Sequence, residues 1–227
     1  DFNLHIPANA MLAVVLAGLL TAHWRFATES FWLNPRIIGK LLLTACIVGI
    51  GIYVSGQGLK DRAEFVWLER AQQIEDYSAE KQSALMHAWE VAPDNYQTAY
   101  ELGECYRLQS WAGHAGYEKL AQEAMSWYDR AAALNPFDPF TPMRYGMCLD
   151  WLDKHVEASK YFDKAKQLAP KDFTVQTYLA WHQMQIDNWK EASRILHEAM
   201  AYSWTETAAG YMEMIDRHLA TPSLLKY

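Results

Sequence analysis

Residues 121–136 read AQEAMSWYDRAAALNP, residues 155–170 read HVEASKYFDKAKQLAP, and residues 189–204 read WKEASRILHEAMAYSW. Each stretch begins 34 residues after the previous one, with alanine at its fourth and eleventh positions and a large apolar residue at its eighth. Small and large residues at this helical spacing predict a helix that packs tightly on a neighbour. The 34-residue period predicts an array in which each repeat is a pair of helices.

The residues around these stretches resemble the tetratricopeptide (TPR) repeat. A small residue stands near the middle of the first helix in the last three expected hairpins: Gly103, Gly146 and Ala180. A proline follows the second helix in the first three: Pro93, Pro136 and Pro170. The resemblance implies an all-α fold, with a TPR-like α-solenoid of about four helical hairpins plus a capping helix. We expect the hairpins over residues 62–92, 96–135, 139–169 and 173–202, and the capping helix over 205–219.

One repeat is longer than the others. The prolines that end the first and second hairpins are 43 residues apart, whereas the next step is 34, so nine residues are inserted, near residues 110–116. Two interpretations stay open. The insertion forms a projecting turn whose Trp111 and His114 touch a partner or the membrane, or it only lengthens a surface loop, which costs little free energy.

Short polar residues mark two of the expected helix starts. Asp94 stands three residues before Gln97, as in a capping box, and Thr141 directly precedes Pro142. We therefore expect Asp94 and Thr141 to be N-cap residues.

Residues 1–59 differ in composition from the rest of the chain. No residue in 6–24 is formally charged at neutral pH, and 37–54 carries only Lys40. At about 1.5 Å per residue, about 19 residues cover a hydrocarbon layer of about 30 Å. We therefore expect two transmembrane helices with a short connecting loop in 1–59, and the helical repeat domain in 60–227. The glycine-containing stretch at 55–58 is expected to be a flexible exit from the membrane.

Buried helices of a soluble core are an alternative interpretation of these apolar runs, although such length without charge favours lipid. A cleaved signal peptide is not favoured, because no basic residue precedes residue 6. Arg25, Arg36 and Lys40 flank the connection between the spans, which indicates a cytoplasmic loop. The repeat domain would then lie outside the cytoplasm. Three basic residues follow the second span and weaken this argument: Lys60, Arg62 and Arg70.

The repeat domain is acidic, with 17 basic and 25 acidic residues and a net charge of −8. Nucleic-acid binding is not expected, since phosphate backbones attract clustered Lys and Arg. The eight histidines form no HExxH, and the three cysteines form no metal pattern, so we expect no catalytic residue, metal or cofactor in this segment. Cys46, Cys105 and Cys148 are interpreted as buried structural thiols.

The outward stripe of the first helices is the candidate partner-binding groove. Its residues are aromatic, methionine-rich and in part charged: Tyr100, Glu104, Arg107, Met143, Met147, Trp151, Thr177, Trp181 and Met184. Thioethers and large rings suit a protein or peptide partner, and tryptophan also stacks on sugar rings. The alternative is that several of these side chains belong to the core. No repeated Lys and Arg clamp for a terminal carboxylate is present.

The opening residues 1–10, DFNLHIPANA, run straight into the first apolar segment. They resemble a segment near the end of the O-antigen ligase/polymerase family of polytopic bacterial membrane proteins, some of which carry TPR repeats after the final span. The resemblance implies that the chain is the C-terminal part of a longer protein of the bacterial inner membrane, with a periplasmic tail. It also implies glycan transfer from a polyprenyl-diphosphate-linked donor. The family's essential residues lie upstream, so this segment alone is expected to be inactive.

Asp1, Asn3 and His5 are the polar residues of this family-like segment. Either they line the glycan site of the complete protein, or hydration and lipid headgroups at the membrane edge account for them.

Three functional hypotheses stay open. In the first, the complete protein is a glycan ligase or polymerase whose TPR tail docks an acceptor or a partner protein. In the second, the chain is a membrane-anchored TPR scaffold without catalytic activity that assembles an envelope or secretion complex. In the third, a protein glycosyltransferase uses the tail to recruit its acceptors. The expected partners are a protein or peptide, membrane lipid and, in the complete protein, a polyprenyl-linked glycan.

Overall fold

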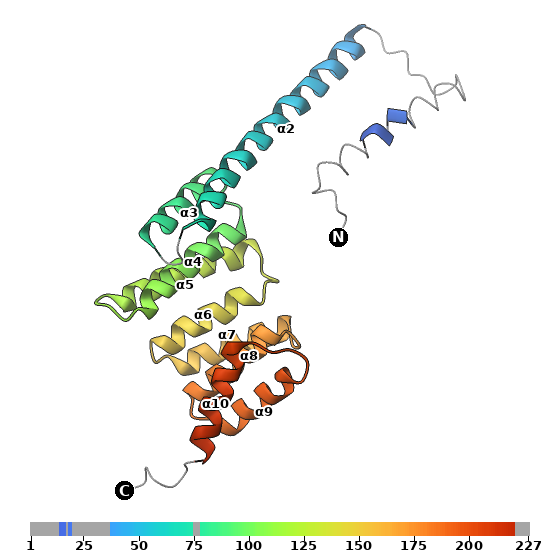
Figure 1. The fold of residues 1–227 in the computed structure, drawn as a ribbon. Helices are drawn as coiled ribbons and strands as arrows, with labels where there is room; N and C mark the ends of the chain where they lie inside the picture. The colour runs from blue at the N-terminus through green and yellow to red at the C-terminus, as the bar shows by residue number, and fades with distance from the viewer. Residues whose placement is uncertain (1–13, 17, 20–36, 75–77, 221–227) are drawn as a thin grey trace. The chain divides into compact units, whose positions relative to one another are not determined.

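The computed structural model describes residues 14–16, 18–19, 37–74 and 78–220 (Figure 1). The chain divides into two compact units, Asp1–Gly56 and Gln57–Tyr227. Every helix named below carries its label from Figure 1. No strand occurs in the ranges that the structure describes.

Helix α2 (Ile37–Gln72) is 36 residues long. Among the described residues it is the one helix that has the length and apolar composition to cross a membrane. The apolar side chains of its first half are not covered by protein, and Leu41, Ile47 and Ile52 are all exposed. The predicted first span, 6–24, lies mostly outside the described residues; those that are described are helical.

The expected flexible exit at residues 55–58 is wrong. The helix continues through this stretch without interruption (Figure 1). Each glycine in a helix costs about 1 kcal/mol relative to alanine. The backbone hydrogen bonds of the flanking turns outweigh this cost, because a break would leave donors and acceptors of both helix ends unpaired.

The second unit is a stack of helical hairpins. Helix α4 pairs with α5, α6 with α7, and α8 with α9, and α10 covers the last pair. At the start of the stack α3 contacts α4, and the end of α2 joins them through the buried Ala71 and through Trp67, whose ring centre lies 4.6 Å from that of His87 in α3. The bounds are α3 Ala79–Val91, α4 Tyr96–Trp111, α5 Tyr117–Leu134, α6 Phe140–Trp151, α7 His155–Leu168, α8 Phe173–Gln185, α9 Trp189–Met200 and α10 Glu206–Ala220. The predicted all-α solenoid of about four hairpins and a capping helix is confirmed.

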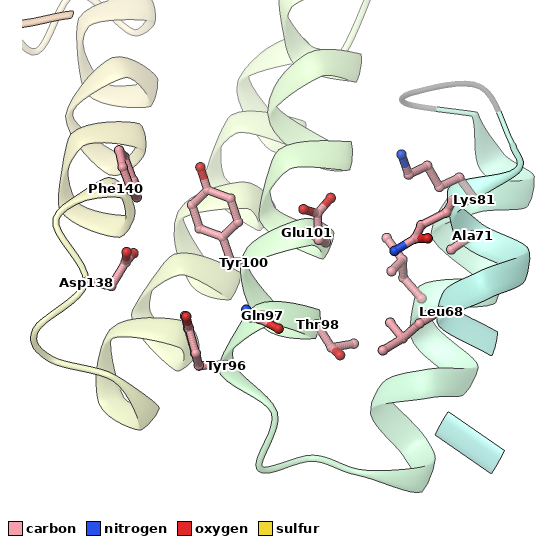
Figure 2. A pocket seen from close by; sticks show the side chains of 12 residues that line it. Leu68, Ala71, Lys81, Tyr96, Gln97, Thr98, Tyr100, Glu101, Asp138 and Phe140 are labelled. Carbon is pink, nitrogen blue, oxygen red and sulfur yellow. The ribbon is translucent and has the colours of Figure 1, made fainter. Parts of the chain in front are cut away.

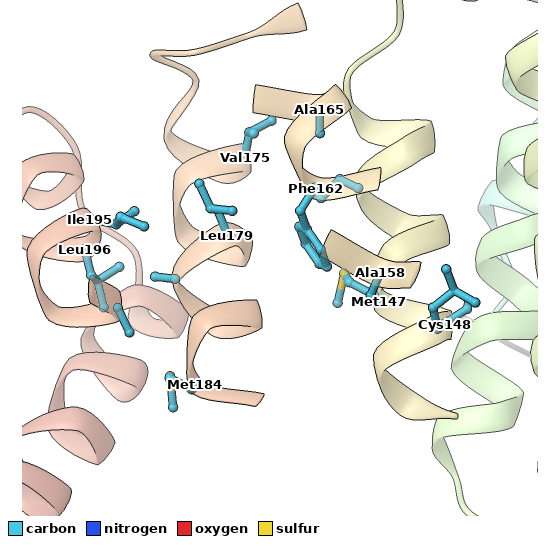
Figure 3. Close-up of a cluster of buried hydrophobic side chains, with 14 of the residues drawn as sticks. Met147, Cys148, Ala158, Phe162, Ala165, Val175, Leu179, Met184, Ile195 and Leu196 are labelled. Atoms are coloured by element: carbon cyan, nitrogen blue, oxygen red, sulfur yellow. The ribbon is translucent and has the colours of Figure 1, made fainter. Parts of the chain in front are cut away.

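The 34-residue pattern is explained by contacts between small and large residues. Tyr128 of α5 packs against the bare backbone of Gly103 in α4, and Phe162 of α7 packs against Gly146 in α6. The repeating alanines of the second helices are fully buried. Figure 3 shows Phe162 within the continuous core that joins α6, α7, α8 and α9. Burial of one such ring contributes about 1.5–3 kcal/mol.

Two predicted helix caps are displaced by one or more residues. The N-cap of α4 is Asn95 rather than Asp94, and its side chain accepts a hydrogen bond from the amide of Gln97 at 2.9 Å. Thr141 lies inside α6, where its amide donates to the Asp138 carboxylate at 2.7 Å. Both helices are therefore capped by a polar side chain, but by a neighbouring one.

The nine-residue insertion mainly lengthens the helices. Helices α4 and α5 have 16 and 18 residues, whereas α6 and α7 have 12 and 14. The link between α4 and α5 is short, and Gly113 and Gly116 adopt positive φ angles of 70° and 87° there. The insertion thus adds about one turn to each helix, with Trp111 at the end of α4 and Tyr117 at the start of α5.

The cysteine interpretation holds for two of the three thiols. Cys105 and Cys148 are buried, and burial raises the pKa of the Cys148 thiol to about 12. Cys46 is exposed on α2, because the protein does not cover that part of the helix.

Candidate partner-binding face

The first helices α4, α6 and α8 lie next to one another in the stack, and α8 also contacts α10. We call the surface formed by these four helices the first-helix face. Three features lie on it: a row of tyrosines around an arginine, an ion-pair network and a cluster of tryptophans.

The tyrosine–arginine row consists of Tyr100, Arg144, Tyr178 and Tyr211, one from each of the four helices. Arg144 donates from Nε to the Tyr100 hydroxyl at 3.3 Å, and its guanidinium lies 4.7 Å from the centre of the Tyr178 ring. Tyr178 meets Tyr211 edge-on, with ring centres 6.5 Å apart. The three phenol groups and the guanidinium therefore form a continuous row of contacts from α4 to α10. Burial raises the pKa of Tyr100 to about 12, so its hydroxyl stays protonated at neutral pH.

The ion-pair network is centred on Glu104. Arg107 binds the Glu104 carboxylate through Nε at 2.8 Å and Nη2 at 2.7 Å, and Arg144 lies 3.4 Å from it. The buried Tyr128 hydroxyl donates to the same carboxylate. Burial alone would raise the pKa of Glu104, but the hydrogen bonds and charge of Arg107, together with Arg144, lower it. Two cations face one anion, which leaves a local net charge of +1.

The tryptophan cluster consists of Trp111, Trp151 and Trp181, with Tyr117 at its edge. The Trp111 ring centre lies 6.3 Å from that of Trp151 and 6.2 Å from that of Trp181. Tyr117 meets Trp151 edge-on at 5.8 Å. The guanidinium of Arg107 stacks 4.6 Å from the Trp111 ring centre and so connects the cluster to the ion-pair network.

The lengthened repeat supplies half of this cluster. Trp111 and Tyr117 lie at the two ends of the α4–α5 link, which the Ser110 hydroxyl fastens by donating to the Tyr117 carbonyl at 2.8 Å. The insertion is therefore more than a lengthened loop, because its side chains pack onto the neighbouring repeats at Trp151 and Trp181. His114 is exposed beside them.

A groove of about 630 Å³ lies at the end of the face nearest α2. Figure 2 shows Tyr100 of α4 between Phe140 and Asp138 on one side and Leu68 and Ala71 on the other. The lining mixes apolar side chains with polar and charged ones, among them Gln97, Lys81 and Glu101. Such a groove fits an extended chain segment that presents both kinds of side chain.

The nine residues predicted for the groove fall into two groups. Tyr100, Glu104, Trp151 and Trp181 keep some exposure. The other five are buried, so their side chains are not accessible surface: Arg107, Met143, Met147, Thr177 and Met184. The methionines fill the joints between repeats within the core. The binding role of the set as a whole stays a prediction.

Three residues of the face were missed by sequence reasoning: Arg144, Tyr178 and Tyr211. Arg144 directly follows Met143, and Tyr178 directly follows Thr177. The predicted stripe is therefore one residue out of phase on α6 and α8. The spacing of 34 residues between Arg144 and Tyr178 was the available signal.

A second polar network joins α6, α7 and α8 inside the stack. His182 donates or accepts at both ring nitrogens, with Nδ1 2.7 Å from Asp150 and Nε2 2.9 Å from the Ser159 hydroxyl. His155 also binds Asp150, at 2.9 Å. The order Ser–His–Asp is that of a hydrolase triad, but His182 is only 1 % exposed and stacks on Phe162 at 4.6 Å. The network therefore satisfies buried polar groups.

The remaining predicted site residues belong to the N-terminal segment, and the predicted absence of a metal site concerns the whole chain. Asp1, Asn3 and His5 lie outside the described residues. Within the described ranges, no group of three or more His, Cys, Asp or Glu side chains is arranged to hold a metal ion.

Comparison with known proteins bears on the fold. The chain is similar to a solved thermophilic TPR protein of Thermus thermophilus, at 13 % identity and a TM-score of 0.56, covering 75 % of this chain and 96 % of that one. The fold is a TPR-like α-solenoid. The first TPR domain of RPAP3 (Spaghetti), solved with an HSP90 peptide, matches at 16 % identity and a TM-score of 0.48, over 56 % and 96 % of the two chains. No protein-family model and no curated protein matches the sequence.

Proposed function

We propose that the chain is a membrane-anchored TPR scaffold that binds an extended segment of a protein partner along the first-helix face. The observation that carries this proposal is the alignment of the tyrosine–arginine row, the groove and the exposed edge of the tryptophan cluster on neighbouring first helices. An extended peptide has the length to touch all three, and its backbone offers hydrogen-bond partners to the tyrosines and Arg144.

Membrane anchoring is the second part of the proposal. The apolar first half of α2 supports it, since these side chains are exposed in the structure and match the thickness of a bilayer. We assign residues 1–59 to a membrane domain with spans near 6–24 and 37–54, and 60–227 to the scaffold. The location is the bacterial inner membrane with the scaffold in the periplasm. A reporter enzyme fused after Tyr227 tests this, and activity confined to the cytoplasm would reject the topology.

The scaffold function is tested by site-specific photo-crosslinking in cells that produce the chain. A photoreactive phenylalanine analogue replaces Glu101, which lines the groove on α4, or Lys164, which is exposed on the second helix α7. The proposal predicts one discrete protein adduct at position 101 and none at 164. No adduct at 101, or adducts of equal yield at both positions, would reject it.

A second candidate function is the C-terminal portion of an O-antigen ligase/polymerase-like glycan transferase, in which the scaffold docks the acceptor. The resemblance of residues 1–10 favours it. Substitution of His5 by alanine in the complete protein, with surface glycan as the readout, tests the role of the polar residues Asp1, Asn3 and His5. Unchanged glycan would reject that role. Many spans upstream of Asp1, with an outer loop that carries Arg and His, would favour this candidate over the scaffold alone.

A further inference from the structure

The tryptophan cluster contains hydrogen-bond donors that have no acceptor. Arg107 Nη1 and Trp111 Nε1 are buried, and neither has a hydrogen-bond partner among the described residues. Their side chains stack on each other at 4.6 Å, so the two donors belong to one place. No buried side-chain oxygen of the described residues is similarly unpaired. The excess is therefore of donors only, and an unpaired buried donor costs about 1–3 kcal/mol.

The rest of the Arg107 guanidinium is already occupied. Its Nε and Nη2 atoms hold the Glu104 carboxylate, and only Nη1 is left. Because Glu104 already holds the two-pronged side of the guanidinium, Nη1 and Trp111 Nε1 offer single N–H donors rather than the paired donors that bind a carboxylate. The group that fits is a neutral acceptor such as a carbonyl oxygen.

The cluster also has a side chain that is positioned to act as a cover. Trp151 is 38 % exposed and contacts both Trp111 and Tyr117. A turn of the Trp151 ring about its side-chain torsions would open the side of the Trp111 ring that faces it. Rotations of exposed side chains of this kind are fast.

The chemical class of the ligand follows from these three features. A polyproline II segment has no internal hydrogen bonds, so its carbonyl oxygens are free, and its prolines bring no amide donors. A polyproline II segment is rigid before it binds, and its proline rings pack against the side chains of aromatic grooves. A sugar hydroxyl is both donor and acceptor, so each one that pairs with Trp111 or Arg107 would bring a further donor into a site that already has too many.

We propose that the tryptophan cluster binds a proline-rich segment of a protein partner in the polyproline II conformation. The Trp151 ring turns outward, and backbone carbonyls of the segment accept hydrogen bonds from Trp111 Nε1 and Arg107 Nη1. This inference rests on the proposed scaffold function and names the class of its partner.

The test uses the full chain in detergent micelles and a fluorescein-labelled peptide of twelve prolines with acetylated and amidated ends, so that no terminal carboxylate is present. Binding is followed by fluorescence anisotropy. We expect saturable binding that Trp111→Phe weakens about tenfold, since phenylalanine keeps a ring but removes the donor. Trp204→Phe is the matched control, because Trp204 is 62 % exposed and is not a member of the cluster. It is expected to leave the affinity unchanged.

A spectroscopic readout keeps the test decisive if Trp111→Phe disturbs the fold. The chain has ten tryptophans, and the indole N–H resonance that this variant removes identifies Trp111. That resonance is expected to move downfield when the proline peptide is added. The inference is overturned if the peptide does not bind, if Trp111→Phe binds as tightly as the wild type, or if the indole resonance stays in place. Binding of a neutral glucan in place of the peptide would also overturn it.

Failure of this inference is distinguishable from failure of the scaffold function. A photo-crosslinked protein adduct at position 101 together with no binding of the proline peptide would leave the scaffold intact and reject the partner class. Loss of both would reject both.

Discussion

Gly146 of α6 lies directly against the ring of Phe162 of α7. A Cβ atom at Gly146 would stand 2.8 Å from Cε2 of Phe162 and 3.4 Å from the carbonyl oxygen of Ala158. Both neighbours belong to the fully buried core, and Phe162 in turn stacks on His182 of the next hairpin. One missing methyl group therefore allows two helices, and through them two repeats, to pack closely.

Gly146→Ala is expected to destabilise the protein by about 1–3 kcal/mol. The added methyl group requires Phe162 to leave its position in a close-packed core, which outweighs the gain of about 1 kcal/mol in helix propensity. Urea unfolding followed by circular dichroism measures the free energy of unfolding.

Gly210→Ala is the matched control, since Gly210 lies in α10 and a Cβ atom there would have nothing within 4 Å. There only helix propensity acts, so the substitution is expected to be neutral or stabilising by up to about 1 kcal/mol. Equal effects of the two substitutions would contradict the packing explanation of the repeat.

The hairpins were predictable from the sequence because the large residues that make these contacts recur at a fixed spacing of 34 residues. A small residue on the first helix and a large one on the second recur in the last three hairpins, and a proline follows each of the first three. The caps were less predictable. Asp94 and Asn95 are both good N-cap residues, and only the backbone path selects Asn95.

Glu104→Gln is expected to destabilise the protein by about 3 kcal/mol. The substitution keeps the size of the side chain but leaves the charges of Arg107 and Arg144 without a buried counterion. The comparison variant is Glu191→Gln, which removes a similar pairing with Arg194 on the exposed surface of α9. Its unfolding free energy should be nearly unchanged. An equally small effect at Glu104 would show that the network contributes no stability.

The same carboxylate predicts a pH dependence. The pKa of Glu104 is lower in the folded protein than the ordinary value of 4.5, so the folded state holds its proton less tightly than the unfolded state. Its stabilising contribution is present above about pH 4.5 and is lost as the pH falls through the folded pKa. The difference in unfolding free energy between wild type and Glu104→Gln should therefore shrink below pH 4.5. A constant difference down to about pH 3, about 1.5 units below the ordinary value, would contradict this assignment.

Ser159→Ala is expected to cost about 1–2 kcal/mol of stability. The Ser159 hydroxyl lies 2.9 Å from Nε2 of the buried His182, and its removal leaves that nitrogen unpaired. Ser193→Ala is the control, since Ser193 makes a comparable contact with His197 at the exposed surface of α9. Thermal unfolding of both variants measures the difference, and equal melting temperatures would indicate that the His182 network is not stabilising.

The first-helix face was only partly predictable. The aromatic and methionine stripe can be read from the sequence. Met143 and Met147, however, suit a buried contact between repeats as well as they suit a groove. The packing of the next hairpin against them places both in the core. The contact of Glu104 with Arg144 joins residues on different repeats, so neither local spacing nor composition indicates it. The spacing of the prolines showed that residues were inserted. It did not show that the insertion lengthens α4 and thereby places Trp111 against Trp151 and Trp181.

The central claim is that a protein segment occupies the first-helix face in the cell. Hydroxyl-radical footprinting tests it most directly, by comparing the oxidation rate of single side chains in native membranes with that in the purified chain. We predict that Trp151 and Tyr178 are protected severalfold in native membranes, while the exposed Trp204 is oxidised at the same rate in both samples. Equal rates at all three positions, or protection at Trp204 alone, would contradict the account.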